Sequence, residues 1–543
     1  MNGAATHKLA ADSGRTSLFM GLGVVAKLAV DVVVITGFGL TRETDAFFVA
    51  YTLLILVESL IYPASQSGLA PIFISTATHG SQERVWAVFN SLFTLAVIAS
   101  TVLAAGAVTA SAALSWLLAP GLDVETSGLA ARLSALMLAG LLFVAPIGVM
   151  RAFLNAHHLY GAPASLELLR GVTVIAVVVG TGLLTGALQI DYLALGYSIA
   201  ALVQALVFGA VIWRRIGPHF RPAIDLPLLR AVGARRMLTL PLLEQGVGQG
   251  VLVAERVIGS FLPPGSISAL SYGHRLASVI GNTLFTGVEV VSLSSLATSL
   301  SVRTAAGLRE ARATLLAGVR LVVILGAPIG TMIWAVQQPV TRLLFEQGTG
   351  ADGSTAALVL GIYALTIPLY GYLLLARSYL YAAGRPLFPV VIAIAQLIAM
   401  VSVAPALAGV YGAAGIAWAY AAGQLVAGVV AALTLNGIAG PGQNRAVMSL
   451  IARTVVAALA TAGAMTFIIG QSSILTAWAG HATIVAQLVI LVLAGSLGAV
   501  VLVGMLLTMH VEEIRALCTT VVAAISRRWM LLYQGRQSVE PES

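Results

Sequence analysis

Charged residues are scarce in this chain: Asp, Glu, Lys and Arg make up only 9% of its 543 residues, whereas 59% are hydrophobic. A soluble domain carries about 25% charged residues, so a soluble protein is excluded. The single cysteine, Cys518, excludes a disulfide framework and a thiolate metal site. There is no Walker-type phosphate loop, so we do not expect ATP to drive the protein directly. No cofactor is expected.

Long apolar runs fill most of the chain. Each crossing of a bilayer needs about 20 apolar residues in a helix that satisfies its own backbone hydrogen bonds. We therefore predict an all-α polytopic membrane protein of about fourteen transmembrane helices. The predicted spans are residues 17–38, 45–72, 86–112, 127–150, 162–184, 192–213, 237–260, 266–298, 314–337, 355–380, 387–408, 411–435, 449–470 and 482–508. Residues 1–16 are polar and read as a tail, with no signal-peptide cleavage site after the first run.

Basic residues are concentrated in alternate loops. One set of loops contains nearly all of them: Lys8, Arg15, Arg84, Arg151, Arg214, Arg215, Arg221, Arg230, Arg235, Arg236, Arg303, Arg309, Arg312, Arg377, Arg385, Arg445, Arg515, Arg527 and Arg528. The other set has little beyond Arg42 and Arg342. Because basic loops stay in the cytoplasm, both termini are predicted to be cytoplasmic, which requires an even number of crossings. The net charge of +8 then follows from topology, and no nucleic-acid partner is expected.

Two basic segments lie between or after the spans. The loop 214–236 is long and arginine-rich, so it is predicted to be cytoplasmic and able to touch anionic lipid headgroups. Residues 511–543 begin with a stretch that mixes Arg527 and Arg528 with Trp529 and Tyr533. This mixture predicts an interfacial helix on the inner leaflet, followed by a tail.

A short motif occurs twice. Arg151-Ala-Phe-Leu-Asn-Ala, followed by Pro163, recurs 226 residues later as Arg377-Ser-Tyr-Leu-Tyr-Ala, followed by Pro389. Each copy closes a helix on the predicted cytoplasmic side. Gln204 and Gln424, in the sixth and twelfth spans, give a weaker match.

These matches predict two parallel repeats of six helices, an N-lobe at 17–213 and a C-lobe at 237–435. Helices 13 and 14, at 449–508, are then an addition. Transporters built from repeated halves bind substrate between them. We therefore expect a central cavity and alternating access by rocking of the lobes.

Eight ionisable residues inside the spans fall in the first two helices of each predicted repeat, four helices that the repeat makes equivalent. They are Lys27, Asp31, Glu58, Glu244, Glu255, Arg256, Arg275 and Glu289. A charge in a spanning helix is costly unless it is paired or faces water, so each is a functional candidate. Mixed charges of this kind suit a substrate with an anionic headgroup such as a diphosphate, which Arg and Lys bind through charge-assisted hydrogen bonds.

The ionisable candidates in the first part of the chain have structural as well as functional explanations. Lys27 and Asp31 share one helical face, which fits either a structural ion pair or a cavity role. Glu58 precedes Tyr62-Pro63, where proline can kink or break the helix, and it is a candidate for a protonatable coupling residue. Arg170 and Glu167, three residues apart, look like a structural pair.

The ionisable candidates in the second half of the chain lie at different depths in the membrane. Arg275 lies about 14 Å into its helix, close to the midplane, where a functional role is favoured. Glu255 and Arg256 point in different directions in the outer third of their span, so either could simply snorkel. Arg132 and Arg320 read as snorkelling anchors.

Four stretches are similar to one known family. They are Thr44 to Ala50 (Thr-Asp-Ala-Phe-Phe-Val-Ala), Ser260 to Ser266 with Tyr272 to Leu276, Leu343 to Gly348, and Arg377 to Pro389. Over roughly residues 17–510 they resemble the MurJ/MviN family of lipid II flippases, within the multidrug/oligosaccharidyl-lipid/polysaccharide exporter superfamily. The resemblance implies a flippase in the bacterial inner membrane that carries an undecaprenyl-diphosphate-linked sugar to the outer leaflet. It implies the lipid-linked sugar and the bilayer as partners, and cell-envelope synthesis enzymes as candidate ones.

Some residues of this chain match the family's characteristic residues, and others differ from them. Arg275 falls on the family's cavity arginine, and Asp45 on the acidic residue of its N-terminal run. Valines stand at the two helix 1 arginine positions, and the helix 2 arginine pair falls at about Glu58 and Ser59. His274 replaces an acidic residue, and Lys27 is a candidate to supply part of the lost positive charge. These departures favour a divergent paralogue that carries another lipid-linked oligosaccharide, such as an exopolysaccharide unit.

Three alternatives stay open. A cation or drug antiporter of the same superfamily would use Asp31 and Glu58 to bind an ion. A membrane glycosyltransferase or ligase would need catalytic groups in large external loops, and here every predicted external loop is short. A transport-inactive scaffold is the third. Membrane potential or an ion gradient is the expected energy source.

Overall fold

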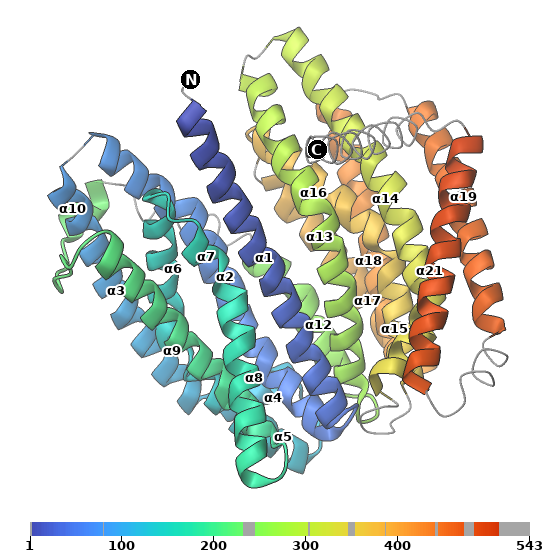
Figure 1. The fold of residues 1–543 in the computed structure, drawn as a ribbon, viewed down its shortest axis with the longest axis horizontal. Helices are drawn as coiled ribbons and strands as arrows, with labels where there is room; N and C mark the ends of the chain where they lie inside the picture. Colours follow the sequence, from blue (N-terminus) through green and yellow to red (C-terminus); the bar gives the residue numbers. More distant parts are fainter. Residues whose placement is uncertain are drawn as a thin grey trace, which may run out of the picture. The chain divides into compact units, whose positions relative to one another are not determined.

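The computed structural model describes residues 3–79, 81–231, 245–301, 304–345, 353–385, 387–439, 444–471 and 483–509. All regular secondary structure in these ranges is helical, which confirms the all-α prediction (Figure 1). The first part of the chain forms α1 (Gly3–Phe38), α2 (Arg42–His79), α3 (Gln82–Thr109), α4 (Ser111–Leu118), α5 (Val124–Leu138), α6 (Leu141–Ala156), α7 (Gly161–Ala164), α8 (Leu166–Thr185), α9 (Ile190–Arg215) and α10 (Leu226–Ala231). The rest forms α12 (Gly250–Gly259), α13 (Ser266–Ser301), α14 (Ala305–Phe345), α15 (Ser354–Leu365), α16 (Ile367–Ala382), α17 (Leu387–Tyr411), α18 (Ala413–Ala439), α19 (Asn444–Gly470) and α21 (Thr483–Thr508).

Eleven helical stretches of the described residues are long and apolar enough to cross a membrane, or twelve if α15 and α16, bent by 42°, form one span. Twelve of the fourteen predicted spans have a counterpart among these. The span predicted at 237–260 begins in residues outside the described ranges. The one predicted at 266–298 is α13, which is long enough but carries Arg275, Glu289 and several serines. The polytopic membrane fold is confirmed, and the count of fourteen stays a prediction.

Predictions for three individual segments can be compared with the structure. The polar N-terminal tail is helical from Gly3, because α1 continues through it into the first span. The proline after Tyr62, which the sequence indicated could kink or break its helix, does not break it: α2 runs through Pro63 to His79. The interfacial helix and tail at 511–543 lie outside the described residues, as does most of the basic loop after residue 231.

The start of α5 lies in a loop outside the spans. Asp123 caps this helix: the backbone N–H of Thr126 donates to Asp123 Oδ1 at 2.8 Å, and the Thr126 hydroxyl donates to Oδ2 at 3.0 Å. These hydrogen bonds, the backbone one first, hold the pKa of the Asp123 carboxyl below its usual range. A carboxylate also complements the positive end of the helix dipole.

The chain forms two compact units. The first contains residues 1–279, 341–359 and 387–427, and the second contains residues 280–340, 360–386 and 428–543. Neither unit is a continuous half of the sequence, and α13 contributes to both. The predicted division into lobes at 17–213 and 237–435, with 449–508 added, stays a prediction.

Glycines let helices of the first unit approach closely. A Cβ atom added at Gly171 of α8 would lie 2.7 Å from the Cβ of Ala26 in α1, and one added at Gly23 would lie 3.1 Å from the Cβ of Glu167. Because glycine has no Cβ, the α1 and α8 backbones pack together along this stretch. This contact positions the charged residues described below.

In the second unit, α19 and α21 lie side by side, as Figure 1 shows. Met465 and Ala494 are buried against Ala335 of α14, and Ala457 and Leu506 are buried against Ile324. The last two spans therefore pack as a pair on α14.

Candidate functional site

The charges predicted inside the membrane gather in the first unit. Arg275 of α13 and Asp31 of α1 form a largely buried ion pair, with 2.6 Å between Arg275 Nη2 and Asp31 Oδ1 and side chains that are 13% and 4% exposed. The Arg275 guanidinium also lies 4.7 Å from the ring centre of Tyr51 and 5.9 Å from that of Phe48, both in α2. A guanidinium is stabilised over aromatic faces as well as by a carboxylate. The sequence singled out both ion-pair partners but did not join them.

A second ion pair links α2 to α8. Arg170 Nη2 lies 2.8 Å from Glu58 Oε1, and Arg170 Nη1 lies 3.6 Å from Glu167 Oε1. The Glu58 and Arg170 side chains are only 5% and 10% exposed, whereas Glu167 is 45% exposed. The predicted Glu167–Arg170 pair is confirmed, but Arg170 is bound more closely by Glu58. The sequence missed this contact because the two residues lie on different helices.

Lys27 lies where α1 packs on α8. It follows Ala26, which touches Gly171, and its ammonium is near enough to Arg275, Glu167, Asp31 and Arg170 to interact with each electrostatically. Within the described ranges, Lys27 forms no ion pair within 4 Å, and its side chain is half-buried. Of the two alternatives for Lys27 and Asp31, the structural ion pair is therefore not formed, since Asp31 binds Arg275 instead.

Arg151, from the first copy of the repeated motif, faces α2. Its guanidinium lies 5.1 Å from the ring centre of Tyr62, one turn beyond Glu58, and its Nε atom is buried with no hydrogen-bond partner in the described part of the chain. In the second unit, the equivalent Arg377 lies 3.2 Å from Glu289 Oε1 of α13. The motif prolines, Pro163 in α7 and Pro389 in α17, are both buried.

The predicted snorkelling of Glu255 and Arg256 is wrong, because both side chains of α12 are fully buried. Glu255 Oε1 lies 3.3 Å from His274 Nδ1, and the His274 ring meets that of Tyr420 edge-on at 5.4 Å. Arg256 Nε donates to the Thr52 hydroxyl at 2.9 Å. These contacts tie α12 to α2 and α13, and α13 to α18. Glu244 lies outside the described residues.

Asp45, at the start of α2, caps another helix. Its carboxylate accepts from the backbone N–H of Gly265 at 2.6 Å, and from the backbone N–H and the hydroxyl of Ser268, both at 2.7 Å. The first turn of α13 therefore receives its anionic cap from α2. Asp45 matches the family's motif by sequence, but only the fold shows this contact.

We call one set of residues the charged cluster. It comprises Lys27, Asp31, Glu58, Arg151, Glu167, Arg170 and Arg275, from α1, α2, α6, α8 and α13. Four of these are cations and three are carboxylates, so the charged cluster carries a net charge of +1. A buried site with excess positive charge and guanidinium groups favours an anion such as a phosphate. No group of three or more His, Cys, Asp or Glu side chains that could hold a metal occurs in the described residues.

The model of one family, "Lipid II flippase MurJ", matches residues 34–489 of this chain. The chain belongs to the lipid II flippase MurJ family. Among the curated MurJ relatives, a probable flippase of Rhizobium tropici is 26% identical over 61% of this chain and 65% of its own length. One of Bdellovibrio bacteriovorus is 27% identical over 58% of each, so this chain spans less than two thirds of either relative. One of Burkholderia cenocepacia is 25% identical over 70% of this chain and 74% of its own.

The fold of the MurJ family also appears among solved structures. A lipid II flippase MurJ in an inward closed conformation matches with a TM-score of 0.71 and 16% identity, over 93% of this chain and 99% of that one. An inward-facing multidrug resistance MATE transporter of the MOP superfamily matches with a TM-score of 0.64 and 14% identity, over 78% of this chain and 94% of that one. This chain therefore shares its fold with both structures.

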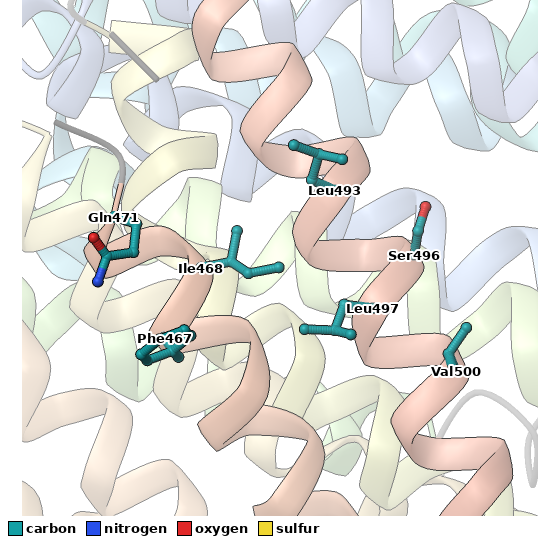
Figure 2. Close-up of a pocket in the computed structure, with 7 residues that line it drawn as sticks. All are labelled: Phe467, Ile468, Gln471, Leu493, Ser496, Leu497 and Val500. Atoms are coloured by element: carbon teal, nitrogen blue, oxygen red, sulfur yellow. The ribbon is translucent and has the colours of Figure 1, made fainter. Parts of the chain in front are cut away.

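A groove on the second unit lies between α19 and α21 (Figure 2). It is lined by Phe467, Ile468, Gln471, Leu493, Ser496, Leu497 and Val500, and encloses about 570 Å³. Five of these seven residues are apolar. Such a lining suits a hydrocarbon chain.

Proposed function

We propose that this protein translocates an undecaprenyl-diphosphate-linked oligosaccharide across the bacterial inner membrane by alternating access. Lipid II or a related cell-envelope or exopolysaccharide precursor is the substrate class. The observation that carries this proposal is the charged cluster, in which four cations outnumber three carboxylates inside a chain of the MurJ family. The apolar lining of the groove between α19 and α21 suits part of the isoprenoid chain of such a substrate.

The state of the carboxylates argues against the cation antiporter. Asp31 and Glu58 were its candidate ion ligands, and each is bound by an arginine at 2.6 and 2.8 Å. A carboxylate whose negative charge is already met by an arginine attracts a second cation less strongly. The relatives carry the names of flippases, which are transporters, and we propose no catalytic role.

We also propose an orientation, an energy source and partners for the protein. We place both termini in the cytoplasm from the distribution of arginines. Membrane potential or an ion gradient is the proposed energy source, and cell-envelope synthesis enzymes are proposed partners.

Genetic complementation tests whether lipid II is the substrate. The gene is expressed in cells depleted of their own lipid II flippase, beside an Arg275→Ala variant and, as a control, Arg132→Ala, whose exposed side chain pairs with Asp191 outside the charged cluster. If lipid II is the substrate, the wild type and Arg132→Ala restore growth and Arg275→Ala does not. If none restores growth and deletion in the native host abolishes an exopolysaccharide, the flippase class stands with that substrate. Normal growth and normal polysaccharides after deletion would contradict the proposal.

A further inference from the structure

We infer that Glu167 is an internal substitute for the substrate's diphosphate: its carboxylate lies among the cations of the charged cluster in the substrate-free protein and is displaced when the lipid diphosphate binds. The inference rests on the proposed function. It assigns a role to a residue that reads from the sequence as half of a structural pair.

Glu167 is the loosely held carboxylate of the charged cluster. Its distance to Arg170 is 3.6 Å, whereas Asp31 and Glu58 lie 2.6 and 2.8 Å from their arginines. Its side chain is 45% exposed, against 4% for Asp31 and 5% for Glu58. Arg170 already has a buried carboxylate in Glu58, so it does not need Glu167 for neutralisation. A carboxylate that is accessible and weakly bound is the one that a competing anion can displace.

Cations surround Glu167 from several helices. Arg170 lies on the same helix, and Gly23 allows α1 to approach the Glu167 Cβ, which brings Lys27 close. Arg151 of α6 and Arg275 of α13 are also within electrostatic range of Glu167. Arg170 thus contacts the Glu167 carboxylate directly, and three further cations attract it electrostatically, so its position favours an anion.

The backbone next to Glu167 is held by a hydrogen bond, while the Glu167 side chain is 45% exposed. The amide of Gln204, fully buried in α9, donates to the carbonyl oxygen of Leu166 at 2.8 Å. Glu167 follows in the first turn of α8, where unpaired backbone N–H groups and the helix dipole favour an anion. When the carboxylate leaves, the same positions still attract a phosphate.

The net charge of the charged cluster without Glu167 matches that of a doubly esterified diphosphate. With Glu167 in place, the charged cluster carries four cations and three carboxylates, a net charge of +1. Withdrawal of Glu167 raises this to +2. A diphosphate esterified at both ends, as in a lipid-linked sugar, has one ionised oxygen on each phosphate and a charge of −2. The displaced state is therefore complementary to the headgroup, whereas the substrate-free state avoids two uncompensated positive charges in the membrane.

Equilibrium binding tests the inference. The full chain in detergent micelles is titrated with an undecaprenyl-diphosphate-linked monosaccharide, whose diphosphate is esterified at both ends. Its Kd is compared among the wild type, Glu167→Gln and Glu125→Gln. Glu125 is the matched control, an exposed carboxylate in the first turn of α5. Glu167→Gln is expected to bind about tenfold more tightly, because the internal competitor is gone, and Glu125→Gln is expected to bind like the wild type.

A second variant measures the coupling. Lys27→Gln should weaken binding by a larger factor in the Glu167→Gln background than in the wild type, since Glu167 no longer neutralises part of the lysine's charge. If Glu167→Gln does not fold, Glu167→Asp, one methylene shorter, should tighten binding by a smaller factor.

The outcomes separate this inference from the proposed function. Wild-type binding that is unchanged or weakened by Glu167→Gln overturns the role of Glu167 and leaves the flippase proposal standing. If no variant binds the undecaprenyl-diphosphate-linked monosaccharide, both are overturned.

Discussion

At the scale of residues, the Asp31–Arg275 ion pair limits what Arg275 can do. The sequence identifies Arg275 as the residue most suited to bind a substrate. In the structure, however, its guanidinium is paired with the Asp31 carboxylate and packs over the ring of Tyr51. A substrate anion has to share or displace these contacts. Lys27 and Arg151 have no such carboxylate partner in the described residues, so they are more open to a new anion.

Removal of Asp31 should destabilise the fold. Asp31→Ala leaves the Arg275 guanidinium buried and uncompensated, a change that costs about 3–5 kcal/mol. The free energy of unfolding, measured by denaturation in detergent, is the readout. Asp191→Ala is the control, because its partner Arg132 has a 62% exposed side chain. Loss of that surface pair should cost no more than about 1 kcal/mol. Equal effects of the two substitutions would contradict the buried ion pair.

At the scale of elements, the charged cluster depends on how closely α1 and α8 pack. Gly171 meets the Cβ, carbonyl carbon and carbonyl oxygen of Ala26, at 2.7, 2.9 and 2.9 Å from an added Cβ. Because part of this contact is backbone, the side chain of Ala26 cannot rotate away to make room. A larger residue at Gly171 must push the two helices apart and carry Lys27 away from Glu167.

Gly171→Ala tests this packing. The added methyl group should cost about 1–3 kcal/mol of unfolding free energy through overpacking. Gly180→Ala, also in α8, is the control: an added Cβ there has nothing within 4 Å. It should leave stability unchanged or raise it by up to about 1 kcal/mol, because alanine is the better helix former. The idea fails if Gly171→Ala is as stable as Gly180→Ala.

At the scale of the whole molecule, the arginine distribution predicts which loops face the cytoplasm. Gln189, in the short turn between α8 and α9, is predicted to be external, and Arg221, in the basic loop after α9, to be cytoplasmic. Both are exposed.

Cysteine labelling checks this orientation. Cys518 is first replaced by serine, so that Gln189→Cys or Arg221→Cys introduces a single thiol. A membrane-impermeant maleimide should label Gln189→Cys in intact spheroplasts, and Arg221→Cys only after permeabilisation. The Cys518→Ser parent controls for unspecific labelling. The reverse pattern would place both termini outside and refute the predicted topology.

Much of the site could be found in the sequence as single residues, but little of it as pairs. Arg275, Asp31, Glu58 and Lys27 stand out because an ionisable group in an apolar span is costly. Glu167 and Arg170 can be paired from sequence because they are three residues apart on one helix. The Glu58–Arg170 contact joins residues 112 positions apart, and helical periodicity gives the face of each helix but not its neighbour.

The sequence by itself determined that this protein is an all-α membrane protein of the MurJ type, with a repeated motif and charges confined to a few spans. The physical reason is that a bilayer admits only helices of a minimum length and apolarity, which are properties of the chain read in order. Only the tertiary structure decided that Asp31 binds Arg275, that Glu255 and Arg256 are buried, and that Glu167 is the exposed carboxylate of the charged cluster. These depend on which helices touch, and close contacts such as that of Gly171 with Ala26 set this by packing in three dimensions.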